Sequence, residues 1–190
     1  MSDKQDAFDE DIKIAGDHFV LPPPDRDEEE PIALELKKNK DNGNIEKAKK
    51  LAQSLAGLVS DSCAFSRFAG SLPQDPAEIE QAKILFAFTV DSLWGALMPN
   101  EITAQSAASE FLSKLSELDP DFYAVICQAE GFSLYLLEGK TKGDPQKIGL
   151  TFAKLCRKEN DSGLALLGKE LYIRFKDYIS EQIKDSSFLS

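Results

Sequence analysis

The sequence has few of the residues from which catalytic and metal centres are built. Its only histidine is His18, and its three cysteines, Cys63, Cys127 and Cys156, are far apart in the chain. A single histidine excludes most catalytic triads, most zinc sites and the paired Glu-x-x-His motifs of di-iron bundles. Each cysteine lies in an apolar segment with helical spacing, so we expect buried free thiols in a reducing compartment.

Motifs that bind phosphate or calcium are incomplete. Residues 139–141, Gly-Lys-Thr, end like a phosphate-binding loop, but Leu134 stands where that loop needs its first glycine. The triplet also closes a predicted helix instead of opening one, so Gly139 fits a helix C-cap. An EF-hand centred on Gly43 would place lysines at three calcium-ligand positions. We therefore expect no cofactor and no metal.

No hydrophobic run is long enough for a membrane span. The most apolar segment, residues 82–98, is about 17 residues long, at the lower limit for a bilayer, and it contains Lys83 and Asp91. The first residues, MSDKQDAFDED, lack the basic start and apolar core of a secretory signal. We therefore expect a cytoplasmic protein without a membrane partner.

The acidic charge is concentrated at the N-terminus. The formal net charge is −11, and residues 1–30 hold 11 acidic against 3 basic side chains. The other 160 residues hold 22 acidic and 19 basic side chains, without the basic stripe that nucleic-acid binding needs. We therefore expect no nucleic-acid partner.

Residues 1–30 are predicted to form an extended acidic arm. Pro22, Pro23 and Pro24 favour polyproline geometry, and the charges around them cannot be buried. One interpretation is a solvating tail without a specific partner. The other is a short linear motif, made by Phe19, Val20, Leu21 and the prolines, that docks on a partner or back onto the domain.

Residues 76–98 are predicted to form the central helix of the domain. Asp75 is a suitable N-cap, Pro76 fits the first helical position, and Glu78 completes a capping-box pattern. Pro99 ends the helix. Because the segment is apolar on nearly every side, it needs neighbours over most of its surface.

The rest of residues 31–190 shows helical periodicity and no convincing strand. Start signals lie at Pro31, Asn44, Asn100 and at Asp-Pro pairs, Asp119-Pro120 and Asp144-Pro145. The predicted helices cover residues 31–39, 44–59 with an extension toward Gly70, 101–118, 120–139, 145–156 and 162–185. The sequence therefore predicts a single all-α domain, a compact bundle or orthogonal array of six to seven helices around residues 76–98.

Two features are candidate contact sites. Six lysines form the only basic cluster, against Asp41 and Glu46 alone: Lys37, Lys38, Lys40, Lys47, Lys49 and Lys50. This cluster is either a solvated face or a docking surface for an anionic partner or the acidic arm. Asp91, in the most apolar helix, lies either on a narrow solvent-facing strip with Glu80, Ala87 and Gly95 or in a polar pocket.

These patterns favour a non-catalytic module for protein interaction or regulation, with the arm and the lysine cluster as contact surfaces. A protein partner is expected, and self-association is compatible with the sequence. A second interpretation is a small-molecule sensor with an apolar pocket among the central helices. A third, an enzyme that uses carboxylates such as Asp91 and Glu130, has the least support.

Overall fold

The computed structural model describes residues 26–70, 72, 75–128, 130–139 and 143–189, and the chain divides into two units, residues 1–34 and 35–190. Most of the predicted acidic arm, with Phe19, Val20 and Leu21, lies outside the described residues. The candidate sites all belong to the unit of residues 35–190.

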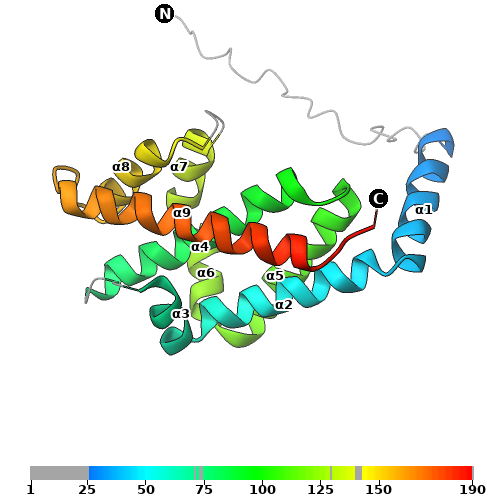
Figure 1. The fold of residues 1–190 in the computed structure, drawn as a ribbon, viewed down its shortest axis with the longest axis horizontal. Coiled ribbons are helices and arrows are strands. Elements are labelled where there is room, and N and C mark those ends of the chain that lie inside the picture. The colour runs from blue at the N-terminus through cyan, green and yellow to red at the C-terminus, as the bar shows by residue number, and fades with distance from the viewer. Residues whose placement is uncertain (1–25, 71, 73–74, 129, 140–142, 190) are drawn as a thin grey trace, which may run out of the picture. The chain divides into compact units, whose positions relative to one another are not determined.

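The described residues contain nine helices and no strand, which confirms the predicted all-α class (Figure 1). None of these helices is both long enough and apolar enough to cross a bilayer. The helices are α1 (Arg26–Asp41), α2 (Asn44–Ser60), α3 (Ser62–Ala69), α4 (Pro76–Leu97), α5 (Glu101–Leu118), α6 (Pro120–Gln128), α7 (Glu130–Gly139), α8 (Pro145–Leu155) and α9 (Ser162–Asp185).

Two predicted helices are each divided in the structure. The expected extension of α2 toward Gly70 is wrong, because the backbone is extended at Asp61 and its carboxylate accepts hydrogen bonds from the amides of Cys63 and Ala64. This N-cap starts α3 as a separate helix. The predicted single helix over residues 120–139 is likewise two helices, α6 and α7.

Helix α1 begins before its predicted start. It starts at Arg26, so Pro31 is its sixth residue and not part of its first turn. The three residues before the proline, Glu28 to Glu30, are strong helix formers, and their negative charge is favourable near a helix N-terminus.

Most predicted caps are confirmed. Side-chain oxygens accept hydrogen bonds from backbone amides at the start of α4, α5, α6 and α8, where the capping residues are Asp75, Asn100, Asp119 and Asp144. The capping box predicted at α4 is not formed. Its Glu78 instead accepts a 2.6 Å hydrogen bond from the ammonium of Lys158, between α8 and α9.

Helix α4 is the central element of the unit. It contacts α5, α7, α8 and α9, and α9 lies across it (Figure 1). Its buried side chains occupy nearly every side of the helix, as predicted. One cluster packs Phe86 edge-on against Phe175 of α9, with ring centroids 5.2 Å apart. The predicted central role of this helix is confirmed.

Candidate functional site

An apolar groove lies where α4, α5, α6 and α7 meet. Its volume is about 240 Å³. The side chains at its base are buried, whereas Asp91, Leu112 and Cys127 at its edge are exposed. The lining residues are Ala87, Val90, Asp91, Trp94, Ala108, Phe111, Leu112, Ile126, Cys127 and Phe132.

Small and large side chains together explain the groove. Ala87 and Ala108 are the smallest side chains in its lining, so they leave space where two helices meet. Larger side chains hold the walls apart, because Trp94 packs edge-on against Phe111 with ring centroids 5.5 Å apart. The shape of the groove therefore follows from packing between helices of the same unit.

Asp91 is the only charged residue among the lining residues. Its carboxylate is at the edge of the groove, exposed to solvent on one side, and no ion pair with it is found among the described residues. Partial burial raises the pKa of Asp91 above its ordinary value, because the charged form loses hydration beside apolar side chains. A cation that reached Asp91 would restore favourable interactions to this carboxylate.

The groove also has a buried donor without a partner. Trp94 is almost fully buried, and its Nε1 has no hydrogen-bond acceptor among the described residues. Leaving such a donor unpaired costs stability. The lining of the groove therefore includes a buried polar group that packing within the described part of the unit leaves without a hydrogen bond.

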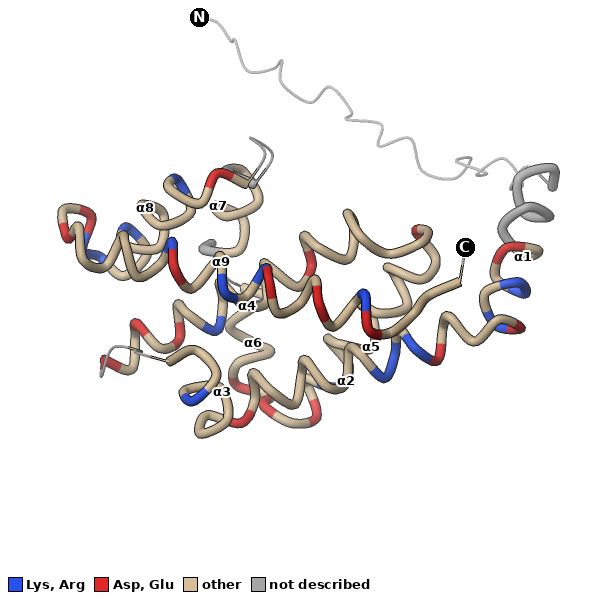
Figure 2. Tube along the Cα trace, viewed as in Figure 1, with Lys and Arg blue, Asp and Glu red and all other residues tan. Residues whose placement is uncertain are grey.

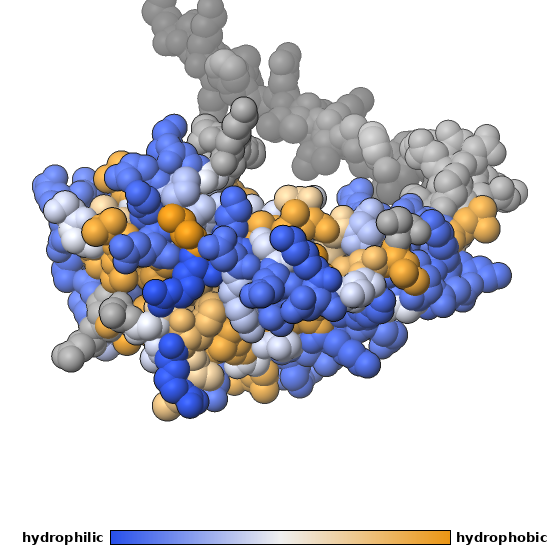
Figure 3. Space-filling view, viewed as in Figure 1, coloured by the Kyte–Doolittle hydropathy of each residue, from blue (hydrophilic) through white to orange (hydrophobic). Residues whose placement is uncertain are grey.

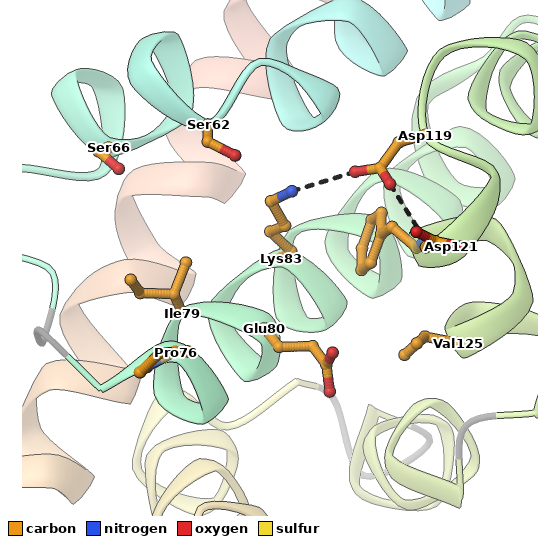
Figure 4. A pocket seen from close by; sticks show the side chains of 10 residues that line it. Ser62, Ser66, Pro76, Ile79, Glu80, Lys83, Asp119, Asp121 and Val125 are labelled. Carbon is orange, nitrogen blue, oxygen red and sulfur yellow. Dashed lines mark hydrogen bonds and ion pairs between the residues drawn. The ribbon is translucent and has the colours of Figure 1, made fainter.

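A second, polar cleft lies between α3, α4 and α6 (Figure 4). In this view Lys83 lies between the serines of α3 and the carboxylates at the start of α6. Its ammonium is 3.2 Å from Asp119 Oδ2 and 5.2 Å from the centre of the Phe122 ring. The other oxygen of Asp119 accepts a hydrogen bond from the amide of Phe122.

The groups in this cleft mainly hold helices together. Asp119 caps α6 and pairs with Lys83 of α4, so one carboxylate joins the two helices. Glu80 and Asp121 are exposed at the edges of the cleft.

The predicted lysine cluster lies on α1 and α2, where Figure 2 shows basic residues on the last turns of α1 and the first turns of α2. Lys37, Lys38, Lys40 and Lys50 are exposed, and Lys47 and Lys49 are partly buried. The Lys47 ammonium donates a 2.7 Å hydrogen bond to the carbonyl of Ser187. One predicted contact residue is thus engaged within the chain.

Next to this cluster, the structure contains a buried polar site that the sequence pattern did not single out. Asn44 was expected to cap α2, but Gly43 occupies the cap position and Asn44 is fully buried. Its side chain binds the backbone of Leu189, 145 residues away. An asparagine after Asn42-Gly43 looks like an ordinary cap, so no local signal reveals this contact.

Cysteine placement differs from the prediction. All three cysteines are free, but Cys63 and Cys127 are exposed, and Cys156 is only partly buried. Burial raises the pKa of Cys156 to about 12, which keeps this thiol protonated and unreactive. No group of three potential metal-binding side chains is found among the described residues.

Comparison with known protein families, with curated proteins and with solved structures finds no match for this chain. The features of this chain that bear on its function are therefore the groove, the polar cleft and the exposed surfaces.

Proposed function

We propose that this protein is a non-catalytic interaction module whose α4–α7 groove binds an apolar side chain of a partner protein. The observation that carries this proposal is a preformed apolar groove with a single carboxylate, Asp91, at its edge. Such a groove suits a partner helix or segment with a leucine or phenylalanine anchor and a lysine or arginine about one turn away.

The size of the groove supports a side-chain anchor. Pockets for drug-sized molecules are commonly about 300–1,000 Å³, whereas this groove has about 240 Å³. Burying one large apolar side chain contributes about 1.5–3 kcal/mol, which corresponds to roughly 10- to 150-fold in affinity.

Asp91 would add selectivity more than strength. Because the carboxylate is exposed on one side, an ion pair with a partner cation contributes at most about 1 kcal/mol, or roughly fivefold in affinity. The groove would thus favour basic over acidic partners of the same shape.

Amphipathic peptides test the proposal directly. A panel carries one leucine or phenylalanine anchor and either lysine or glutamate four residues later, and binding is measured by fluorescence anisotropy. We expect the lysine peptides to bind about fivefold more tightly than the glutamate peptides. Asp91→Asn should abolish this preference, whereas the control Glu159→Gln, at an exposed acid outside the groove lining, should retain it.

Filling the groove is the complementary test. Ala108→Leu places a larger side chain in the lining and should reduce peptide affinity at least tenfold, whereas Ala124→Leu, at an exposed site outside the lining, should not. Equal binding by both variants would refute a role for the groove.

A small-molecule sensor remains the second candidate, favoured by the buried apolar base of the groove. A thermal-shift screen with small aromatic amines distinguishes it, because a ligand that binds only the folded protein raises its melting temperature. Shifts that Ala108→Leu abolishes, together with no peptide binding, would favour the sensor.

A further inference from the structure

Asn44 binds the backbone of the C-terminal segment as a neighbouring β-strand would. Its Nδ2 donates to the Leu189 carbonyl at 2.7 Å, and its Oδ1 accepts from the Leu189 amide at 2.9 Å. Both polar groups of one residue are therefore paired with one side chain. Asn44 is 0% exposed, so the pairing takes place in a dry environment where hydrogen bonds are strong.

Other buried groups hold the Asn44 amide in this orientation. Asn39, 2% exposed, accepts a 3.1 Å hydrogen bond from Asn44 Nδ2 and a 3.0 Å hydrogen bond from Asn100 Nδ2. The other end of the Asn39 amide donates to the Glu35 carbonyl at 2.9 Å. Helices α1, α2 and α5 thus build the site without help from the C-terminal segment.

The site recognises backbone more than side chains. Besides the Asn44 pair, Lys47 binds the carbonyl of Ser187, again a main-chain atom. The Leu189 side chain is 53% exposed and contributes little selectivity. Phe188, in contrast, is partly buried and packs against the apolar core. The site therefore selects an extended segment with a large apolar residue just before the residue that Asn44 binds.

We infer that the Asn44 site is a docking site for an extended segment of a partner protein, which the chain's own residues 187–189 occupy in its absence. The exposed lysines on α1 and α2 favour a segment with acidic residues beside its apolar one, through charge complementarity. In this chain the acid nearest to Phe188 is Asp185, three residues before it and next to Lys184.

Competition by the chain's own segment sets the expected affinity. A tethered segment acts at an effective concentration of order millimolar, so an incoming peptide binds the wild-type protein weakly. Weakening the tethered segment should raise the apparent affinity for a free peptide, because more molecules then have an empty site. The left-handed backbone at Ser187, φ 51°, is unfavourable for serine and makes the segment easier to displace.

A pair of substitutions at one position tests this in the full chain. Leu189→Pro removes the backbone N–H that donates a hydrogen bond to Asn44 Oδ1. Leu189→Ala keeps the main-chain hydrogen bonds and shortens only an exposed side chain. The probe is the peptide Asp-Ser-Ser-Phe-Leu-Ser with blocked ends, and the signal is the Asn44 side-chain amide in ¹H–¹⁵N spectra.

We expect Leu189→Ala to leave the Asn44 signals as in the wild type and Leu189→Pro to shift them. Added peptide should return the signals of Leu189→Pro toward wild-type positions, with at least tenfold tighter apparent binding than to the wild type. A peptide with an N-methylated leucine should fail, and one with lysine in place of its aspartate should bind more weakly at low salt.

Three results would overturn the inference. The two Leu189 variants could give the same spectra, or the peptide could leave the Asn44 signals of Leu189→Pro unchanged up to several millimolar. The third is a wild-type dimer in sedimentation experiments that Leu189→Pro abolishes, because the natural occupant would then be a second copy of this chain.

Discussion

The packing of α8 against α9 gives the sharpest stability prediction, because glycines stand at their contact. A Cβ atom added at Gly149 would overlap the Ala165 carbonyl oxygen and lie 3.0 Å from the Cβ of Lys169. A Cβ atom added at Gly168 would lie 2.5 Å from the Cβ of Phe152. We therefore expect Gly149→Ala to destabilise the protein by forcing the helices apart.

Two effects of opposite sign determine the size of the change. Replacing glycine by alanine inside a helix stabilises it by about 1 kcal/mol. Overpacking a close contact costs about 1–3 kcal/mol, and the upper end applies here because the overlapped atom at Gly149 belongs to the backbone and cannot rotate away. The net loss is about 2 kcal/mol, or a fall of about 4–8 °C in melting temperature for a chain of this size.

Gly57 in α2 is the matched control, because a Cβ atom there would have no neighbour within 4 Å. Gly57→Ala should raise the free energy of unfolding by about 0.5–1 kcal/mol. Both variants are compared by urea denaturation and by thermal melting. If Gly149→Ala is as stable as Gly57→Ala, the close α8–α9 packing described here is refuted.

Three further predictions concern titratable groups. Tyr135→Phe removes a buried hydroxyl that has no partner among the described residues, so the free energy of unfolding should rise by about 1 kcal/mol in urea denaturation. Thiol labelling at pH 8 should modify Cys63 and Cys127 quickly and Cys156 only slowly, because the pKa of Cys156 is raised to about 12; equal rates would contradict this. The raised pKa of Asp91 means that the folded protein binds this proton more tightly than the unfolded chain, so its contribution to stability falls as pH rises through the folded pKa. The stability of Asp91→Asn relative to the wild type should therefore be higher at pH 7 than at pH 3, as measured by denaturation at both pH values.

Local signals explain why α4 was predictable and some helix boundaries were not. The signals for the ends of α4 are adjacent to those ends in the sequence, with Asp75 and Pro76 at its start and Pro99 just after its last residue. Its apolar residues on nearly every side indicate that other helices cover it. The break at Asp61 depends on a weaker capping signal, which the continuing apolar periodicity of Phe65 obscures. The start of α1 differs because the helix extends five residues before Pro31, although a proline at its sixth position cannot donate a backbone hydrogen bond.

The candidate sites depend on which helices are neighbours in the folded chain, and local sequence patterns do not reveal these neighbours. Asp91 was singled out because a carboxylate is unusual in an apolar helix, yet the groove beside it also needs α5, α6 and α7. The Asn44 site joins α1, α2, α5 and the residues after α9 through hydrogen bonds between distant residues. Figure 3 shows apolar side chains in several separate groups on one face, so surface hydropathy alone does not mark a single site either.

The ionic contacts of α4 fix it relative to its neighbours, and this supports the proposed role of its groove in recognition. Near its start, Glu78 is almost fully buried and pairs with Lys158, and Lys83 pairs with Asp119 at the beginning of α6. Removing one partner of such a contact leaves the other uncompensated, so these pairs hold α4 in one position relative to its neighbours. A groove whose floor is held in this way exists before a partner arrives, and binding then requires little ordering of the protein. Of the four charged residues of α4, Glu78 and Lys83 form the pairs that fix the helix, whereas Glu80 and Asp91 have no ion-pair partner among the described residues. Only Asp91 of these two lines the groove, which supports its proposed role in selecting a partner.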